Sequence, residues 1–366
     1  MSLRKIAFLK ILKMKEKDNG MIDVEVSREA AEATERIRRH IESLPEVKRP
    51  KVCIKCITYN HGEFIRETLD GFLMQQTDFP FVAIVHDDAS TDNTADIVRE
   101  YAERYPDIIF PIFETENQYR KPGGPLTKIM QDAIDATGAP YVAMCEGDDY
   151  WTSPHKLQLQ ADFLDTHPDY VMVTHNYSTL IQDNGEIKAG IDYPRKDYDL
   201  STYIECERWI YQPLTIMYRS TAMEIDKLMQ YRDRRDLIFI YHILTHGKGH
   251  YFNQELGTYR VHQGGVWSGI VSSQLETLTR EYKGRRCIYD VEKSAEAACL
   301  LIWPIVVLNY SRSFLLKNTK VFRGAVMPYF KHFGIEELSK VLYRRFCLNK
   351  FGHEEFAKSV AANVKG

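Results

Sequence analysis

Strand-like and helix-like segments alternate along the chain from residue 52, and this alternation constrains the fold more than any other feature of the sequence. Short β-rich apolar runs predict strands, and apolar residues at helical spacing predict the helices between them. The expected strands cover 52–58, 81–86, 108–113, 141–145 and 171–176, and the expected helices cover 64–75, 95–105, 126–136 and 154–166. Strands joined by helices form right-handed crossovers, so the sequence predicts an α/β fold with a mostly parallel sheet flanked by helices.

An acidic cluster follows the strand expected at 141–145 and consists of Glu146, Asp148 and Asp149. Burying these carboxylates without partners would be costly, so we expect them to face solvent or to hold a cation. In open α/β sheets, ligands bind outside the carboxyl ends of the strands, which is where this cluster should lie. Oxygen ligands favour Mg²⁺ or Mn²⁺. We expect Asp149 to bridge the cation to a pyrophosphate, with Asp148 assisting the metal or contacting a ribose. The alternative is a solvated acidic turn.

Two polar loops follow the first two expected strands. Thr58, Tyr59 and Asn60 come directly after the first strand, where polar side chains can meet the edge of a nucleotide base and the Tyr59 ring can stack on it. Asp88 follows the second strand, where a carboxylate can accept a hydrogen bond from a base or a ribose. The alternatives are an ordinary loop at 58–62 and helix capping by Asp88 or Ser90.

The order of these motifs resembles the family 2 glycosyltransferases of bacterial polysaccharide assembly. The resemblance spans roughly residues 50–268 and is specific as an ordered set, although each motif is weak alone. The motifs are Thr58-Tyr59-Asn60-His61, Asp87-Asp88-Ala89-Ser90-Thr91-Asp92, Glu116-Asn117-Gln118-Tyr119, Glu146-Gly147-Asp148-Asp149-Tyr150-Trp151, Lys156-Leu157-Gln158, Asp162-Phe163-Leu164 and the segment 259–267. The resemblance implies a GT-A fold, a nucleotide-sugar donor that is usually a UDP-sugar, a divalent cation and inversion at the anomeric carbon.

Site residues can be carried over from the family by motif. Thr58, Tyr59, Asn60 and Asp88 would hold the base and ribose. Asp148 and Asp149 stand at the Asp-x-Asp region, where Gly147 replaces the first acidic residue, so the metal would rest mainly on Asp149.

Residues further along the chain would complete this site. The His262 imidazole would ligate the cation or hydrogen-bond the pyrophosphate. Trp151 would line the sugar or acceptor side, and Trp267 would close over the donor. Core packing is the alternative for both tryptophans, and a structural role is the alternative for His262.

An inverting transfer also needs a carboxylate that removes the proton from the acceptor hydroxyl. The family places it at the start of a helix, and Asp236 immediately precedes the apolar helical run 237–244. Asp236 is therefore the predicted base, with Asp233 second, and a plain N-cap is the alternative for Asp236. A helix N-terminus and Arg235 would lower the pKa of Asp236, whereas desolvation by a bound acceptor would raise it. The sequence leaves this balance open.

Composition excludes several classes of function. A net charge of −3 argues against general nucleic-acid binding. Cys53 and Cys56 lie in one expected strand, where residues three apart point to opposite faces, so they should not bind zinc. No apolar stretch reaches about 18 residues, and Lys10 interrupts the N-terminal apolar run, so we expect neither a transmembrane helix nor a signal peptide. These features predict a cytoplasmic protein, peripheral on the inner face of the membrane if the C-terminal region binds lipid.

The sequence divides into an extension with a charged helix at 1–49, a catalytic domain at 50–273 and a helical region at 274–366. The last region interleaves basic and aromatic residues. Such helices can lie on an anionic membrane, where a lipid-linked saccharide acceptor would reside, or they can pack against the catalytic domain or a second copy of the chain. A glycan without a lipid is the other expected acceptor.

Two further functions fit a nucleotide site on an α/β sheet. A nucleotidyltransferase that makes a nucleotide-sugar would need a Gly-rich, basic phosphate loop after the first strand, and residues 58–62 do not supply one. A non-catalytic nucleotide-sugar-binding protein would need no base at Asp236.

Overall fold

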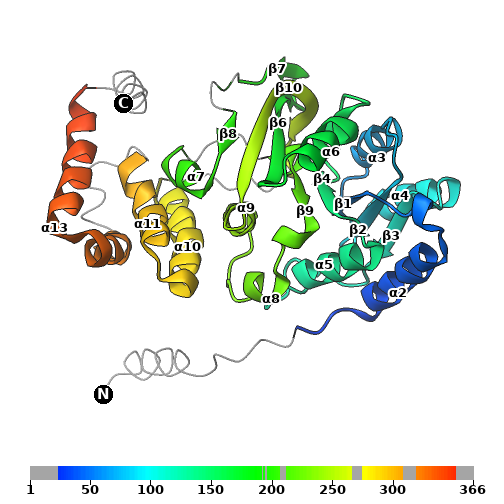
Figure 1. Ribbon diagram of the computed structural model, residues 1–366, viewed down its shortest axis with the longest axis horizontal. Coiled ribbons are helices and arrows are strands. Elements are labelled where there is room, and N and C mark those ends of the chain that lie inside the picture. The colour runs from blue at the N-terminus through cyan, green and yellow to red at the C-terminus, as the bar shows by residue number, and fades with distance from the viewer. Residues whose placement is uncertain are drawn as a thin grey trace.

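The structure, a computed structural model, describes residues 24–191, 193, 196–206, 212–265, 274–307 and 319–351. One mixed sheet forms the centre, helices cover both of its faces, and a group of helices lies beyond one edge (Figure 1). The expectations for Lys10 and Trp267 lie outside the described residues.

The first half of the sheet is parallel, as predicted. Its strand order is β3-β2-β1-β4, and every neighbouring pair in this half is parallel. Helices α3, α4 and α5 connect these strands. The bounds are β1 Val52–Thr58, α3 Ile65–Leu73, β2 Phe81–Asp87, α4 Thr94–Arg104, β3 Ile109–Phe113, α5 Pro125–Thr137 and β4 Tyr141–Met144. The predicted elements are confirmed with small shifts at their ends.

The second half of the sheet is mixed. β9 pairs antiparallel with both β4 and β6, while β6 and β10 are parallel to each other. The remaining bounds are β5 Tyr150–Trp151, α6 Lys156–Thr166, β6 Tyr170–Ile181, β7 Glu186–Lys188, β8 Asp197–Tyr198, α7 Leu200–Cys206, β9 Met217–Arg219, α8 Ile225–Leu228, α9 Asp236–Leu244 and β10 Lys248–Val261. A 3₁₀ turn at Pro213–Thr215 precedes β9. Pro213 lacks the N–H that a ladder would need.

Two hydrophobic layers enclose the sheet. One contains buried residues of α2, α5 and α9, and the other contains buried residues of α3, α4 and α6. In Figure 1, α2 and α5 lie below the sheet and α3 and α6 lie above it. Cys53 belongs to the first layer and Cys56 to the second, so the two thiols point to opposite faces, as predicted.

The charged helix expected near the N-terminus is α2, Arg28–Ser43. The Ser27 side chain accepts a hydrogen bond from the Ala30 N–H at 3.1 Å and caps the helix. A stripe that includes Ala33, Ile37 and Ile41 is buried in the layer shared with α5. Helix α2 is therefore packed onto the sheet rather than projecting from it.

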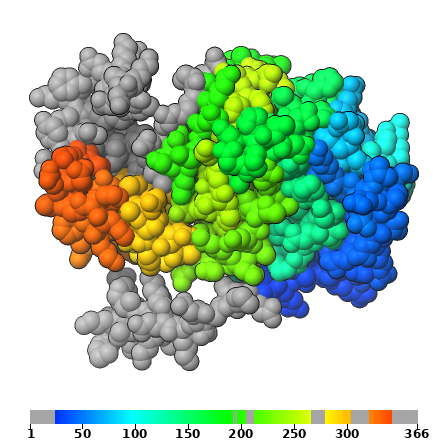
Figure 2. Space-filling view, in the orientation of Figure 1, coloured from blue at the N-terminus to red at the C-terminus, as the bar shows by residue number. Residues whose placement is uncertain are grey.

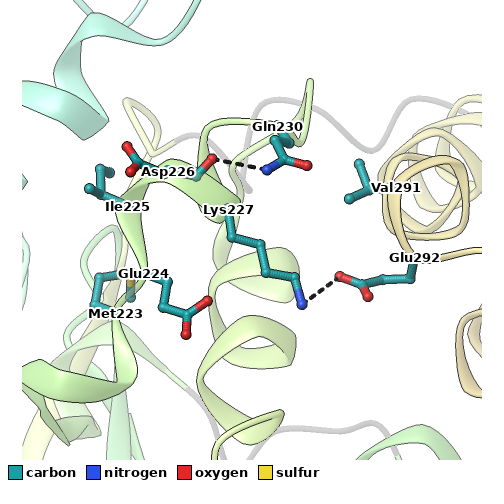
Figure 3. A pocket seen from close by; sticks show the side chains of 8 residues that line it. All are labelled: Met223, Glu224, Ile225, Asp226, Lys227, Gln230, Val291 and Glu292. Atoms are coloured by element: carbon teal, nitrogen blue, oxygen red, sulfur yellow. Dashed lines mark hydrogen bonds and ion pairs between the residues drawn. The ribbon is translucent and has the colours of Figure 1, made fainter. Parts of the chain in front are cut away.

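The C-terminal helices are α10 Gln274–Glu292, α11 Ala295–Val307 and α13 Thr319–Phe351. Helix α10 lies beside α9, α11 lies beside α7, and α13 packs on α11 (Figure 1). Figure 2 shows this yellow-to-red region against the green part of the chain, and its buried residues continue the layer that holds α9. Glu292 at the end of α10 accepts a hydrogen bond from the Tyr231 hydroxyl and pairs with Lys227 Nζ at 3.2 Å. This ion pair lies in a pocket between residues 223–230 and α10 (Figure 3), which none of the predicted site residues line.

Among the described helices, none has the length and apolar character that crossing a membrane requires. Helix α13 exposes the apolar side chains of Met327, Phe330 and Ile335.

The packing of α2 can be tested by removing its central buried side chain. Ile37 is 2% exposed, so Ile37→Ala should lower the free energy of unfolding by about 2–4 kcal/mol through lost burial and a cavity. Arg36→Ala on the exposed side of the same helix is the control and should change it by less than about 0.5 kcal/mol. Urea denaturation measures both, and equal effects would show that α2 does not belong to the core.

Candidate active site

The loops that follow the parallel strands meet at one edge of the sheet. Asp88 N donates to Thr58 O at 3.0 Å, and Gly147 N donates to Ile57 O at 2.9 Å. The loops after β1, β2 and β4 are therefore in direct contact, as expected for the carboxyl ends of neighbouring parallel strands.

The acidic loop has no room for a side chain at Gly147. A Cβ there would lie 2.5 Å from Thr58 Oγ1. The Thr68 hydroxyl of α3 lies 3.1 Å from Gly147 O and 2.7 Å from Asp149 O, and these contacts hold the acidic loop against α3. Close packing against β1 thus explains why the motif has glycine where the family has its first acidic residue.

Three side chains from distant parts of the chain form a cluster that could hold a cation: His61, Asp148 and His262. Their ligand atoms lie within 4.8 Å of one another. Asp148 Oδ2 is 3.2 Å from His262 Nε2 and 3.7 Å from His61 Nε2. His61 belongs to the loop after β1, Asp148 follows β4, and His262 follows β10.

The ionisation of this cluster suits a cation. Burial lowers the pKa of His61, which favours the neutral imidazole. Burial opposes ionisation of Asp148, but its hydrogen bond with His262 and the nearby His61 hold its pKa below the usual value. A neutral imidazole and an ionised carboxylate are the forms that bind metals.

Asp149, the main cation ligand expected from the sequence, lies outside this cluster. Its side chain is 2% exposed, and its Oδ1 accepts a hydrogen bond from Arg260 N at 2.8 Å. Burial raises the pKa of Asp149. The structure therefore places Asp148 and His262 together as predicted, but puts His61 where Asp149 was expected. His61 is the last residue of the Thr58–His61 motif, which follows the end of β1. This position in the sequence was the signal that could have identified His61 as a site residue.

Arg260 ties the acidic loop to its surroundings. It is buried, and its Nε donates to Asp148 O at 2.9 Å. Its guanidinium also donates to Gln182 Oε1 at 2.5 Å and to Glu67, and it packs on the Phe64 ring at 4.7 Å. These contacts set the direction of β10 just before His262.

The loops expected to hold the nucleotide are tied to each other. Asn60 has a φ of 55°, and its Oδ1 accepts a hydrogen bond from Thr91 N at 2.8 Å. The buried Thr58 hydroxyl has no hydrogen-bond partner among the described residues. Tyr59 lies at the same loop, with the Arg120 guanidinium 5.9 Å from its ring. The structure thus brings Thr58, Tyr59 and Asn60 to the site edge.

The burial and hydrogen-bond partners of Asp88 differ from those expected of a carboxylate that only binds a ribose. It is 1% exposed, and its two carboxylate oxygens accept hydrogen bonds from Gln118 N at 2.6 Å and Tyr119 N at 3.0 Å. Its observed contacts hold the 116–119 segment beside β2. A contact with a nucleotide therefore stays a prediction for Asp88.

Trp151 differs from the expectation that it lines a sugar site. It is 2% exposed, its indole N–H donates to Leu214 O at 2.9 Å, and Lys156 Nζ lies 4.0 Å from its ring centre. The ring also packs on Phe72. Core packing, the alternative for this residue, is what the structure shows, because the ring lies in the hydrophobic layer that holds α3, α4 and α6.

The two candidate bases have different environments. Asp233 pairs with Arg235 at 2.6 Å, whereas no described side chain forms an ion pair with Asp236. Asp236 is the first residue of α9 and is exposed to solvent. Of the two carboxylates, Asp236 is therefore the one available to an incoming hydroxyl.

Although Asp236 as a whole residue is exposed, its pKa is raised, because protein atoms packed around the carboxylate desolvate it even without an acceptor. The surrounding protein raises this pKa, and Lys55 and Arg235 act in the opposite direction. Desolvation and the charges of Asp236 and Asp148 also raise the pKa of Glu146, to about 8. The charge of Asp236 therefore acts on Glu146, and the charge of Lys55 acts on both carboxyl groups.

Comparison with known proteins matches part of the chain to a family. Residues 53–227 match the family described as Glycosyl transferase family 2. Asp236 and His262 lie beyond this segment, so their roles rest on geometry. The uncharacterized protein Mb1547 of Mycobacterium bovis is 33% identical over 216 residues, which cover 58% of this chain and 60% of that protein. The chain thus spans about three fifths of this curated relative.

Other relatives carry functional names. The uncharacterized glycosyltransferase alr2836 of Nostoc sp. is 26% identical over 296 residues, covering 79% of this chain and 88% of that protein. The Bacillus subtilis protein TuaG, whose name assigns it to teichuronic acid biosynthesis, is 28% identical over 218 residues, covering 58% of this chain and 80% of TuaG.

The crystal structure of S. aureus TarS in complex with UDP-GlcNAc superposes with a TM-score of 0.56 at 18% identity, covering 80% of this chain and 83% of that chain. This likeness shows the fold, which is the predicted GT-A fold.

The cation cluster can be tested with Mn²⁺ alone. His61→Ala and Asp148→Asn should each weaken Mn²⁺ binding at least ~10-fold, because each removes one of the three side chains that could hold the ion. His155→Ala and Asp78→Asn replace exposed residues of the same types and should leave binding unchanged. Isothermal titration calorimetry measures the affinities. Loss of binding in Asp149→Asn, with Asp148→Asn unaffected, would restore Asp149 as the ligand.

Proposed function

Residues 53–227 belong to the glycosyl transferase family 2, and from this premise we propose that the chain is an inverting, cation-dependent glycosyltransferase that moves a sugar from a nucleotide-sugar to an acceptor hydroxyl. The observation that carries the proposal is the His61–Asp148–His262 cluster at the carboxyl ends of the strands. Asp236, at the start of α9, adds a carboxylate whose charge, like that of Asp148, acts on Glu146. The cluster supplies a place for a diphosphate-bound cation, and Asp236 supplies a base.

The residues of the cluster fit a divalent cation. Two imidazole nitrogens and one carboxylate oxygen form a mixed set of ligands. Such a set suits Mn²⁺ better than Mg²⁺, which prefers oxygen ligands alone. When bound, the cation would supply Lewis-acid stabilisation of the departing nucleoside diphosphate.

The chain's own residues would carry out the proton transfer. Asp236 would take the proton of the acceptor hydroxyl while the hydroxyl oxygen bonds to the anomeric carbon. The bond from that carbon to the diphosphate breaks at the same time, and its electron pair leaves with the diphosphate. A single displacement from the opposite face inverts the anomeric centre. The raised pKa of Asp236 makes it a stronger base than an ordinary aspartate.

The nature of donor and acceptor is proposed from the relatives. TarS was solved with UDP-GlcNAc, and a UDP-sugar is the first choice of donor here. Thr58, Tyr59 and Asn60, with Asp88 behind them, are proposed to hold its base and ribose. TuaG is named for teichuronic acid biosynthesis, which supports a glycan or lipid-linked saccharide as acceptor.

The organisation of the whole chain is also a proposal. We propose a catalytic domain at 50–273 between an N-terminal extension at 1–49 and a helical region at 274–366. A cytoplasmic protein whose α13 touches the inner face of the membrane is proposed from the exposed Met327, Phe330 and Ile335. A second copy of the chain on the same helix is the alternative.

The base is tested by Asp236→Asn, which keeps the shape of the side chain and removes its basicity. Transfer from a UDP-sugar to an acceptor should fall by about 10²–10⁴-fold, while binding of UDP with Mn²⁺ is retained. Asp233→Asn is the matched control, because its carboxylate is engaged by Arg235, and it should keep most of the activity.

Three outcomes would contradict the proposal in different ways. Full transfer by Asp236→Asn together with loss in Asp233→Asn would move the base to Asp233. Release of pyrophosphate from a sugar phosphate and a nucleoside triphosphate would favour the nucleotidyltransferase. Unchanged cellular function in Asp236→Asn would favour a non-catalytic binding protein.

The donor base can be identified by thermal stability. UDP with Mn²⁺ should raise the melting temperature, because a ligand at a hundred times its dissociation constant adds about 2.7 kcal/mol to the stability of the native state. GDP with Mn²⁺ is the matched comparison and should give a smaller shift. A larger shift with GDP would replace uridine as the expected base.

A further inference from the structure

Lys55 is a charged, partly exposed residue at the centre of a strand whose other residues, apart from Ile57, are buried. It lies in β1, between the parallel neighbours β2 and β4, where it pairs with Ile84 and Met144. Strand residues alternate between faces, so Lys55 shares the face of Cys53, which is the face covered by α9. An ammonium group in such a position is costly unless something nearby uses its charge.

The Lys55 side chain reaches the first turn of α9. Its Nζ lies 5.0 Å from the centre of the Phe239 ring. Phe239 is three residues after Asp236 on the same helix, and residues at this spacing lie on one side. The ring holds the ammonium group by a cation–π contact, and among the described residues no carboxylate is within ion-pair distance of it.

Charged and titratable groups face Asp236 from every element packed around it. They are Lys55 on β1, Glu146 after β4, Tyr203 on α7, Arg235 before α9 and Arg280 on α10. Arg235 is committed elsewhere, since it pairs with Asp233 at 2.6 Å and donates to Arg280 O at 2.9 Å. Lys55 is the cation that the sheet itself presents to the carboxylate.

We infer that Lys55 is a positioning residue of the transfer reaction, whose ammonium group, held on the Phe239 ring in the first turn of α9, keeps the Asp236 carboxylate ionised. The inference rests on the proposed function through the role of Asp236. Lys55 does not touch the reacting atoms and acts through Asp236.

The electrostatics agree with this geometry. Among the charges that act against desolvation at Asp236, that of Lys55 is the largest. Burial lowers the pKa of Lys55, and Asp236 is the first of the charges that raise it. The two groups therefore stabilise each other's charged form. Glu146 acts in the opposite sense, because its negative charge disfavours a second carboxylate.

The sign of the effect follows from the charge. A positive neighbour lowers a carboxyl pKa, so removing it in Lys55→Met should raise the pKa of Asp236 by about one pH unit. The base works only when ionised, and the acidic limb of kcat/KM should move to higher pH by the same amount. Activity should recover on the alkaline side, and the KM for the UDP-sugar should stay unchanged.

The experiment compares Lys55→Met, Lys55→Arg and the exposed control Lys48→Met in the full chain. Lys55→Arg keeps the charge and should leave the pH profile near that of wild type. Lys48→Met should not move it. A carbon-13 NMR titration of the Asp236 carboxyl, assigned by its loss in Asp236→Asn, gives a second readout that needs no activity.

The outcomes separate the two proposals. Unchanged pH profile and unchanged NMR titration in an active Lys55→Met protein would overturn this inference alone. A wild-type protein that transfers no sugar from any nucleotide-sugar would overturn the proposed function, and with it the catalytic role of Lys55. A shifted titration together with a shifted profile supports both.

Discussion

The contact between the buried Asp149 carboxylate and the backbone of β10 is the interaction on which the site depends. Asp149 Oδ1 accepts the Arg260 N–H at 2.8 Å, and the Arg260 side chain returns a hydrogen bond to Asp148 O. The two adjacent aspartates therefore have different roles. Asp149 anchors the loop to the sheet, and Asp148 is turned toward His61 and His262. A buried carboxylate needs such partners, since an unpartnered one would be costly.

The titratable side chains of the site fall into two groups that differ in their electrostatic surroundings. The cluster of His61, Asp148 and His262 has the ionisation that suits a cation. The surroundings of Asp236 and Glu146 raise the pKa values of both carboxyl groups. The charge of Lys55 on β1 acts on both of them. A site that must hold a diphosphate and also accept a proton needs these two environments close together but distinct, and α9 packed over the sheet provides the second.

Much of the fold was predictable, because it follows from local patterns. The strands and helices from Val52 to Met144 appear where the apolar spacing places them, and the opposite orientation of Cys53 and Cys56 follows from the period of a strand. The second half of the sheet was less predictable. β9 enters antiparallel between β4 and β6, and no local pattern fixes such a pairing. Trp151 was predicted to line a sugar site and is buried instead, for the same reason. Its neighbours Phe72 and Leu214 come from other elements.

The sequence by itself determined the order of strands and helices and the placing of an acidic loop at a strand end, since both depend on residue types that are close along the chain. It also marked Asp236 as the start of a helix. Only the tertiary structure decided which aspartate of the loop faces His262, that His61 joins them, and that Lys55 lies beneath α9. These choices depend on contacts between segments that are distant in the chain, where burial and hydrogen bonding, and not local spacing, set the direction of each side chain.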